Sequence, residues 1–150
     1  MDAVTYPQEA VAEFVSTRTV PLRIPSDAQP YAGQFNVKWT PTLVTLDRDG
    51  TEHHRTLGFL PPEELIPSLL LGSVKCHFDA ERFEAALKEL DELLSQYPKS
   101  DAAPEAIFVR GVARYKHTGD PKPLKEAYEK LAADYPDSPW AKRALPYRLL

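Results

Sequence analysis

Residues 39–50 read Trp-Thr-Pro-Thr-Leu-Val-Thr-Leu-Asp-Arg-Asp-Gly, and this stretch decides the fold of the first half of the chain. The run Thr42–Leu46 is rich in β-branched and apolar residues, which is typical of a strand. Residues 47–50 have the composition of a tight turn, with a glycine available for a positive φ. Residues 51–57 can return as the partner strand. The sequence therefore predicts a β-hairpin that follows a proline-containing loop.

The segments around this hairpin predict further helices and strands. Apolar spacing favours a helix over residues 7–16, and the β-branched residues 20–24 indicate another strand. After the hairpin, residues 60–64 open a helix, because prolines and acidic residues are favoured in a first helical turn. We expect Gly72 to close that helix. Residues 1–72 thus predict a small α/β domain.

The second half of the chain changes to a helical period. Apolar residues between positions 83 and 97 recur on one face of a long helix that Pro98 ends. Further helices are expected over residues 104–117 and 122–134, and a fourth from about residue 138. This half of the chain therefore predicts a purely helical region.

An internal repeat organises these helices into two hairpins. Residues 93–100 align with residues 131–138 at an offset of 38 residues, and both copies contain Tyr-Pro-x-Ser. Each helical hairpin has one apolar face that it cannot bury alone, so it must stack on a neighbour. We expect this all-α region over residues 78–150, joined to residues 1–72 by a short linker of residues 73–77.

Composition and charge exclude several functional classes. The chain has 150 residues and a formal net charge of −4, which gives no electrostatic reason to bind nucleic acid or an anionic membrane. No apolar run is long enough to span a bilayer, and we expect a cytoplasmic protein. The single cysteine, Cys76, excludes an internal disulfide, a Cys-x-x-Cys redox centre and a cysteine-rich zinc site within these residues.

Residues 39–50, followed by the Gly-Phe pair at 58–59 and a final helix, resemble the thioredoxin family, in which a loop with a cis-proline leads into an edge hairpin. Residues 1–7 are similar to the helix that follows the family's Cys-x-x-Cys motif, and residues 20–24 to the next strand. The helical hairpins resemble tetratricopeptide repeats. Bacterial thioredoxin-like proteins with a helical repeat tail look similar over the whole length. The resemblance implies an incomplete thioredoxin-like α/β fold over residues 1–72 and an all-α tetratricopeptide-like region after it.

The same resemblance places the family's redox cysteines just before Met1. Thioredoxin chemistry needs a thiolate of lowered pKa and a second, resolving thiol, and Cys76 has no partner thiol. We therefore expect no catalytic residue, no metal site and no cofactor in this chain, which should be inert in thiol–disulfide exchange. The alternative is a fragment of a thiol–disulfide oxidoreductase, acting in redox homeostasis, whose Cys-x-x-Cys segment precedes Met1.

The strand that precedes the family's cysteines is also absent from the sequence. In the family it lies between the strands that residues 20–24 and Thr42–Leu46 resemble, so its absence leaves unpaired backbone groups on both neighbours. Either these two strands pair directly or another chain supplies the missing strand. We therefore expect self-association or an altered sheet order.

The function that these observations favour is non-catalytic binding of a protein or peptide client. In the family, the residue before the cis-proline pairs with an extended peptide, which implies a docking site at Trp39, Thr40 and Pro41. The alternative is that Pro41 only sets the loop and Trp39 packs in the core.

The groove of the predicted helical hairpins, on the helix over residues 104–117, offers another candidate surface. Arg110, Arg114 and Tyr115 lie where such repeats often face a ligand; the alternative is that Tyr115 belongs to the core and the cations are solvated. His53 and His54 are adjacent on a predicted strand, so they point to opposite faces and cannot chelate one metal together. We expect these two histidines on a solvent-facing edge.

Overall fold

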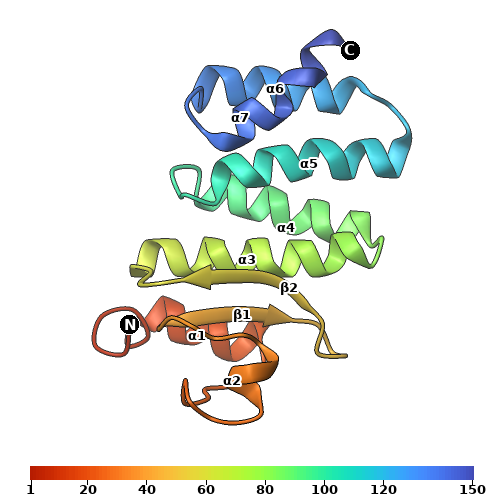
Figure 1. The fold of residues 1–150 in the computed structure, drawn as a ribbon. Coiled ribbons are helices and arrows are strands. Elements are labelled where there is room, and N and C mark those ends of the chain that lie inside the picture. The colour runs from red at the N-terminus through yellow and green to blue at the C-terminus, as the bar shows by residue number, and fades with distance from the viewer. The chain divides into compact units, whose positions relative to one another are not determined.

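A computed structural model describes residues 1–150 and divides them into two compact units, Met1–Ile66 and Pro67–Leu150. In chain order the elements are α1 (Glu9–Arg18), α2 (Tyr31–Gln34), β1 (Thr42–Leu46), β2 (Glu52–Leu57), α3 (Pro62–Asp79), α4 (Phe83–Gln96), α5 (Ala103–Thr118), α6 (Lys122–Asp134), α7 (Pro139–Ala144) and the 3-10 helix η1 (Leu145–Leu149) (Figure 1). The first unit contains the sheet, and the second is entirely helical. None of these helices is both long enough and apolar enough to span a membrane.

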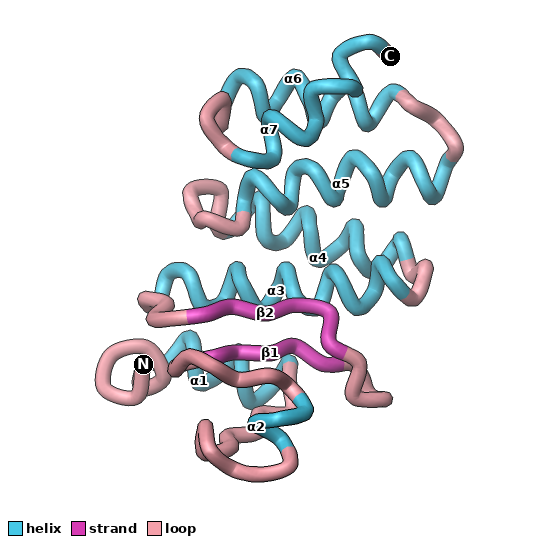
Figure 2. The backbone as a smooth tube through the Cα atoms, viewed as in Figure 1, coloured by secondary structure: helices cyan, strands magenta, loops and turns pink.

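The predicted hairpin is confirmed. Strands β1 and β2 pair antiparallel, with Thr42 opposite Leu57 and a bulge near the turn, and they are the two magenta segments of Figure 2. The Asp47 carboxylate closes the turn, because its Oδ1 accepts the backbone N–H groups of Asp49 and Thr51, each at 2.9 Å. Gly50 takes a φ of 84°, which a residue without a Cβ adopts at little cost.

The predicted strand over residues 20–24 is wrong, and with it the alternative in which that strand pairs directly with Thr42–Leu46. The sheet has two strands, and residues 20–24 form part of the long irregular connection before α2 (Figure 2). Val20 is 97% exposed and Leu22 is 79% exposed. A strand needs a hydrogen-bonded neighbour, and Pro21 lacks the N–H that would pair with one. The β-branched composition alone therefore did not produce a strand.

The predicted linker over residues 73–77 is also wrong, because helix α3 continues through it from Pro62 to Asp79. Gly72 lies inside this helix and does not end it. The buried residues Leu70, Leu71 and Val74 recur at the spacing of three and four residues that defines one helical face. This apolar face extends across Gly72, so packing outweighs the low helix propensity of a glycine.

The second unit is built from helices that pack on their neighbours in sequence. Helix α5 contacts α4, α6 and α7, and α6 also contacts α7 and η1 (Figure 1). One buried cluster within this unit consists of Ile107, Ala127, Leu131, Ala141 and Ala144. The aromatic rings of Phe108 and Trp140 pack beside it with centroids 5.2 Å apart. The predicted helices over 83–97, 104–117 and 122–134 are confirmed within two residues at each end.

The two Tyr-Pro-x-Ser segments form equivalent corners between helices. In the first corner the Ser100 hydroxyl donates to the carbonyl of Tyr97 at 2.9 Å. In the second, the Ser138 hydroxyl accepts the N–H of Ala141 at 3.1 Å and caps α7. The phenol of Tyr135 donates to the carbonyl of Pro98, so the second corner is hydrogen-bonded to the first.

Helices α5 and α6 approach most closely at Gly111. A Cβ atom placed on this residue would lie 2.7 Å from the Cβ of Ala127 and 2.9 Å from the carbonyl oxygen of Pro123. Both distances are below van der Waals contact, so the missing side chain is what permits the approach. Gly119, which follows α5, has a φ of 75° and open space around it, so its role is to end the helix.

Candidate functional site

The loop of residues 39–41 presents an aromatic side chain to solvent. Trp39 is 66% exposed, so the alternative that it packs in the core does not describe the structure. The Thr40–Pro41 peptide bond is cis, as in the loop that the resemblance implied. The hydroxyl of Thr42 donates to the carbonyl of Trp39 at 2.6 Å, and the N–H of Gly58 donates to the carbonyl of Pro41 at 2.8 Å. These two hydrogen bonds hold the loop against the start of β1 and the end of β2.

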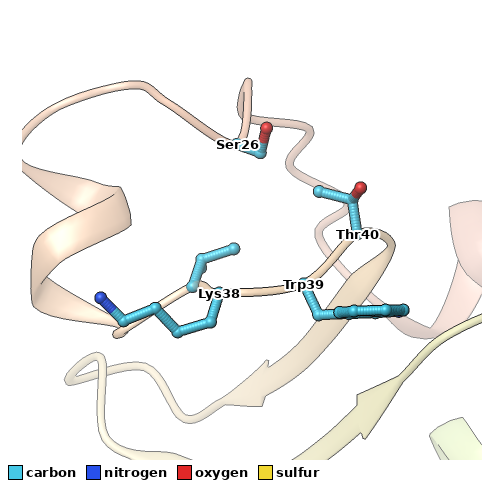
Figure 3. A pocket seen from close by; sticks show the side chains of 5 residues that line it. Ser26, Lys38, Trp39 and Thr40 are labelled. Atoms are coloured by element: carbon cyan, nitrogen blue, oxygen red, sulfur yellow. The ribbon is translucent and has the colours of Figure 1, made fainter.

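Trp39 and Thr40 line an open pocket of about 340 Å³ together with Ser26, Val37 and Lys38. Figure 3 shows that the Trp39 ring and the Lys38 ammonium point away from each other. The side chains of Ser26 and Thr40 lie at other positions around the pocket. An aromatic face, a cation and two hydroxyls at the rim of one depression can bind a chain segment that is partly apolar and partly polar. Ser26, Val37 and Lys38 were not predicted. Lys38 could have been suggested by its position beside Trp39, but Ser26 is brought there only by the folding of the preceding loop.

Arg55 on β2 connects the sheet to the segment that leads into this loop. Its Nη2 donates to the carbonyl of Phe35 at 2.7 Å, and its Nε and Nη2 donate to the two carboxylate oxygens of Glu52, each at 2.7 Å. The hydrogen bond from Arg55 lowers the pKa of Glu52, and the same bond raises the pKa of Arg55. The guanidinium therefore fixes the start of the loop to the hairpin.

A second polar pair stabilises the hairpin turn itself. His53 Nε2 lies 2.9 Å from Asp47 Oδ2, and only 9% of the His53 side chain is exposed. The expectation that His53 lies on a solvent-facing edge is therefore wrong. The hydrogen bond from His53 lowers the pKa of Asp47 to about 2, and the N–H groups of Thr51 and Asp49 act in the same direction. No group of three His, Cys, Asp or Glu side chains is gathered where it could hold a metal ion.

The three candidate residues on the repeats do not share one surface. Arg110 Nε lies 2.7 Å from Asp91 Oδ1, so Arg110 is directed toward α4. Arg114 follows one helical turn later on the same side of α5. Tyr115 lies seven residues after Phe108, whose ring contacts Trp140 on α7, and therefore belongs to the stripe that leads toward α7. Tyr115 is exposed, so its ring is not part of the core.

Comparison with models of protein families finds one family for the first half of the chain and another for the second half. A model of a thioredoxin-like domain matches residues 3–72, and a model of the tetratricopeptide repeat matches residues 69–100 and again residues 105–138. The chain combines a thioredoxin-like domain with tetratricopeptide repeats. The small sheet with its helices is an incomplete thioredoxin fold, and the helical hairpins are the repeats. The comparisons with curated proteins and with solved structures gave no match.

These assignments place the candidate residues in their domains. The loop with Trp39 and its pocket lies within the thioredoxin-like match, and Arg110, Arg114 and Tyr115 lie within the second repeat match. Cys76, the one cysteine of the sequence, is half-buried in helix α3 and lies beyond residue 72, where the thioredoxin-like match ends. Tetratricopeptide repeats generally mediate interactions between proteins.

Proposed function

We propose that this chain is a non-catalytic module that binds a protein or peptide client, and that an extended client peptide docks at Trp39, Thr40 and Pro41. The observation that carries the proposal is the exposed indole of Trp39 at the rim of the pocket. Tryptophan is among the residues that contribute most to protein interfaces, because it buries a large apolar area and keeps one polar N–H group.

The chemistry of the pocket supports an extended peptide as the ligand. The hydroxyls of Ser26 and Thr40 can hydrogen-bond to a peptide backbone, while the Trp39 ring contacts an apolar side chain. The Lys38 ammonium adds a positive charge to the same rim, so a client segment with a carboxylate near its apolar residue is favoured. The proposed role of the loop is therefore recognition of a partly apolar, acidic segment.

In this proposal the repeats supply further contacts on two sides of α5, through Arg110, Arg114 and Tyr115. Arg110 already pairs with Asp91, so its contribution to a client contact is reduced by that competing carboxylate. Arg114 and the exposed ring of Tyr115 are then the stronger contacts. Because they lie on different sides of α5, they would contact different parts of a client.

Alanine substitution of Trp39 tests the proposed site. The probe is an array of unrelated acidic and neutral 12-residue peptides, with binding measured by titration of those the wild-type chain retains. We expect Trp39→Ala to weaken binding at least tenfold, which is about 1.4 kcal/mol, because a buried interface tryptophan contributes more than this amount. Trp39→Phe, which keeps an aromatic ring, should retain most of the affinity.

A matched control separates the site from exposed apolar surface in general. Leu22→Ala also removes an exposed apolar side chain, but Leu22 is not among the pocket residues. We expect this variant to bind as the wild type does. Equal losses in Leu22→Ala and Trp39→Ala, or no loss in either, would contradict the proposed docking site.

The redox part of the proposal has its own test. With Cys76 as the one thiol of the sequence, the chain cannot cycle between an intramolecular dithiol and a disulfide. We infer that it does not reduce insulin with dithiothreitol as the electron source, when a thioredoxin is run in parallel as the positive control. Turnover above the rate with dithiothreitol alone would overturn the inference that the chain is redox-inert.

We also infer that the chain associates with itself through an unpaired strand edge. The support is the two-stranded sheet, in which β1 has β2 as its partner on one side and no strand on the other. An uncovered edge can accept a strand from another chain. Concentration-dependent sedimentation of the full chain tests this inference.

A further inference from the structure

A row of four side chains connects helix α5 to α7 and η1 in the second unit. The Arg143 guanidinium lies over the Trp140 ring, 4.6 Å from its centroid. The centroid of the Trp140 ring lies 5.2 Å from that of Phe108. The Phe108 ring also stacks on Tyr147, with centroids 5.9 Å apart and planes 24° apart. Helix α5 contacts α7, and α7 contacts η1 (Figure 1), so these four residues form one continuous feature, which we call the aromatic row.

The aromatic row lies at the surface of the unit and not within its core. Its three rings, Phe108, Trp140 and Tyr147, pack beside the buried cluster, yet each is only half-buried, and Arg143 is exposed. Aromatic side chains with a packed body and an accessible edge are enriched at protein interfaces. A ligand that covers the row would bury the remaining ring surface without rearranging the helices.

The polar groups of the aromatic row are not engaged by other parts of the chain. The Arg143 guanidinium forms no ion pair, and neither the Trp140 indole N–H nor the Tyr147 hydroxyl forms a hydrogen bond. By contrast, Arg55 and Arg110 each pair with a carboxylate. Stacking on an indole holds a guanidinium in place and leaves the N–H groups at its edge available. The row therefore presents preorganised hydrogen-bond donors beside an apolar surface.

The helices α7 and η1, which carry three of these four residues, are positively charged. They contain three cations, Lys142, Arg143 and Arg148, and no acidic residue, although the whole chain has a net charge of −4. The one acidic residue of α5, Glu105, pairs with Lys75 of α3 at 2.6 Å. A local positive charge on a negatively charged chain directs an acidic ligand to that place, because the rest of the surface repels it.

We propose that the aromatic row is a second docking site for a client, and that it binds a segment in which a carboxylate stands beside an aromatic or leucine side chain. The carboxylate pairs with the edge N–H groups of Arg143, in the two-point geometry that guanidinium and carboxylate favour. The apolar side chain covers the accessible edges of Trp140 and Tyr147, and the Tyr147 hydroxyl donates to a backbone carbonyl. This inference rests on the proposed client binding and assigns the partner's chemistry on the second unit.

Tryptophan fluorescence tests the site directly. The sequence has two tryptophans, so in the full chain carrying Trp39→Ala the emission comes from Trp140 alone. The probe is a set of short synthetic peptides that place glutamate beside phenylalanine or leucine, with a matched set that has glutamine in place of glutamate. We expect the glutamate set to shift the Trp140 emission to shorter wavelength, because a ligand over the indole excludes water from it. These peptides should bind about tenfold more tightly than their glutamine counterparts.

Substitution of Arg143 separates a binding role from a structural one. In the Trp39→Ala chain, Arg143→Gln should weaken binding of the glutamate peptides about tenfold and leave the glutamine peptides nearly unaffected, because the lost interaction is with the carboxylate. A role limited to packing on Trp140 would lower both affinities equally. The matched control is Lys142→Gln, which removes the same charge at a residue two positions from Trp140 and therefore on another face of α7. We expect this control to bind as its parent does.

A second variant keeps the test independent of how well Arg143→Gln folds, which circular dichroism measures. Tyr147→Phe retains the stacked ring and removes the hydroxyl, so it should weaken binding of both peptide sets about threefold, through the lost hydrogen bond to the peptide backbone. Equal binding of the two sets by the parent chain, or unchanged binding in Tyr147→Phe, would contradict the proposed contacts.

Other results would also overturn the proposal. These are a glutamate set that leaves the Trp140 emission unchanged, and equal losses in Arg143→Gln and Lys142→Gln. Phosphatidylserine vesicles are titrated in parallel, and binding of the vesicles in place of the peptides would assign the row to a membrane surface. The tryptophan loop is tested separately. Peptide binding that depends on Trp39 in the Arg143→Gln chain supports the loop alone, and binding that depends on Arg143 in the Trp39→Ala chain supports the aromatic row alone.

Discussion

The contact between helices α5 and α6 at Gly111 allows a prediction whose sign depends on the structure. In a helix interior, replacing glycine by alanine ordinarily stabilises a protein by about 0.5–1 kcal/mol, because alanine restricts the unfolded chain and favours the helix. At position 111 the new Cβ would lie 2.7 Å from the Cβ of Ala127 and 2.9 Å from the Pro123 carbonyl oxygen. Overpacking of this kind costs about 1–3 kcal/mol.

We therefore expect Gly111→Ala to lower the free energy of unfolding by up to about 2.5 kcal/mol, which is the overpacking cost less the gain in helix propensity. Urea denaturation followed by circular dichroism at 222 nm measures this difference. The calibration is Ala132→Gly on the exposed side of α6, which should lose about 0.5–1 kcal/mol from helix propensity alone. The loss of unfolding free energy measured for Ala132→Gly then gives the helix-propensity contribution with which the Gly111→Ala result is interpreted.

A double-mutant cycle locates the cause. Ala127→Gly removes one of the two clashing atoms, so Gly111→Ala should cost less in that background than in the wild type, with a coupling of about 1 kcal/mol. The Pro123 carbonyl remains, so the rescue is partial. A Gly111→Ala chain that is more stable than the wild type by the amount expected from helix propensity would refute the close approach of the two helices.

Three further predictions concern individual polar contacts. Asp47→Asn keeps the turn but loses the carboxylate oxygen that accepts from His53. Because the pKa of Asp47 is lowered to about 2 in the folded chain, its contribution to stability is present above about pH 4 and is lost as the pH falls toward 2. The difference in the free energy of unfolding between wild type and variant, measured by urea unfolding at a series of pH values, should therefore shrink over that interval. Arg55→Lys cannot bond both Phe35 and its carboxylate partner in the same geometry, so amide hydrogen exchange in residues 35–41 should accelerate while α5 is unaffected. Tyr135→Phe removes the bond between the two helical corners and should cost about 0.5–1.5 kcal/mol in urea unfolding, and an unchanged midpoint would show that this bond contributes nothing.

The sequence predicted the elements whose determinants are local. The hairpin turn depends on Asp47 and Gly50, which act within a few residues, and the helical corners depend on the Tyr-Pro-x-Ser segments. The strand predicted over residues 20–24 did not form, because a strand needs a hydrogen-bonded neighbour and composition alone does not indicate whether one is present. The expected break at Gly72 failed because a continuing apolar face overrode the weak local signal of one glycine.

The candidate site was predictable only in part, for the same reason. Trp39, Thr40 and Pro41 are adjacent in sequence, and the resemblance of that segment to a known loop made them visible. Ser26 reaches the same pocket through the fold of an irregular segment that has no periodic signal. The anchoring of the loop by Arg55 depends on strand register, which places a side chain of β2 within reach of a carbonyl 20 residues earlier.

The turn around Gly119 makes the repeats convenient to label. A side chain added at this residue would meet no atom within 4 Å, and the neighbouring residues Thr118 and Asp120 are exposed. Short insertions are tolerated at loop tips of this kind, where no buried backbone is displaced. A fluorophore or a small affinity handle introduced between residues 119 and 121 would therefore mark the repeats while leaving the packing between α5 and α6 in place.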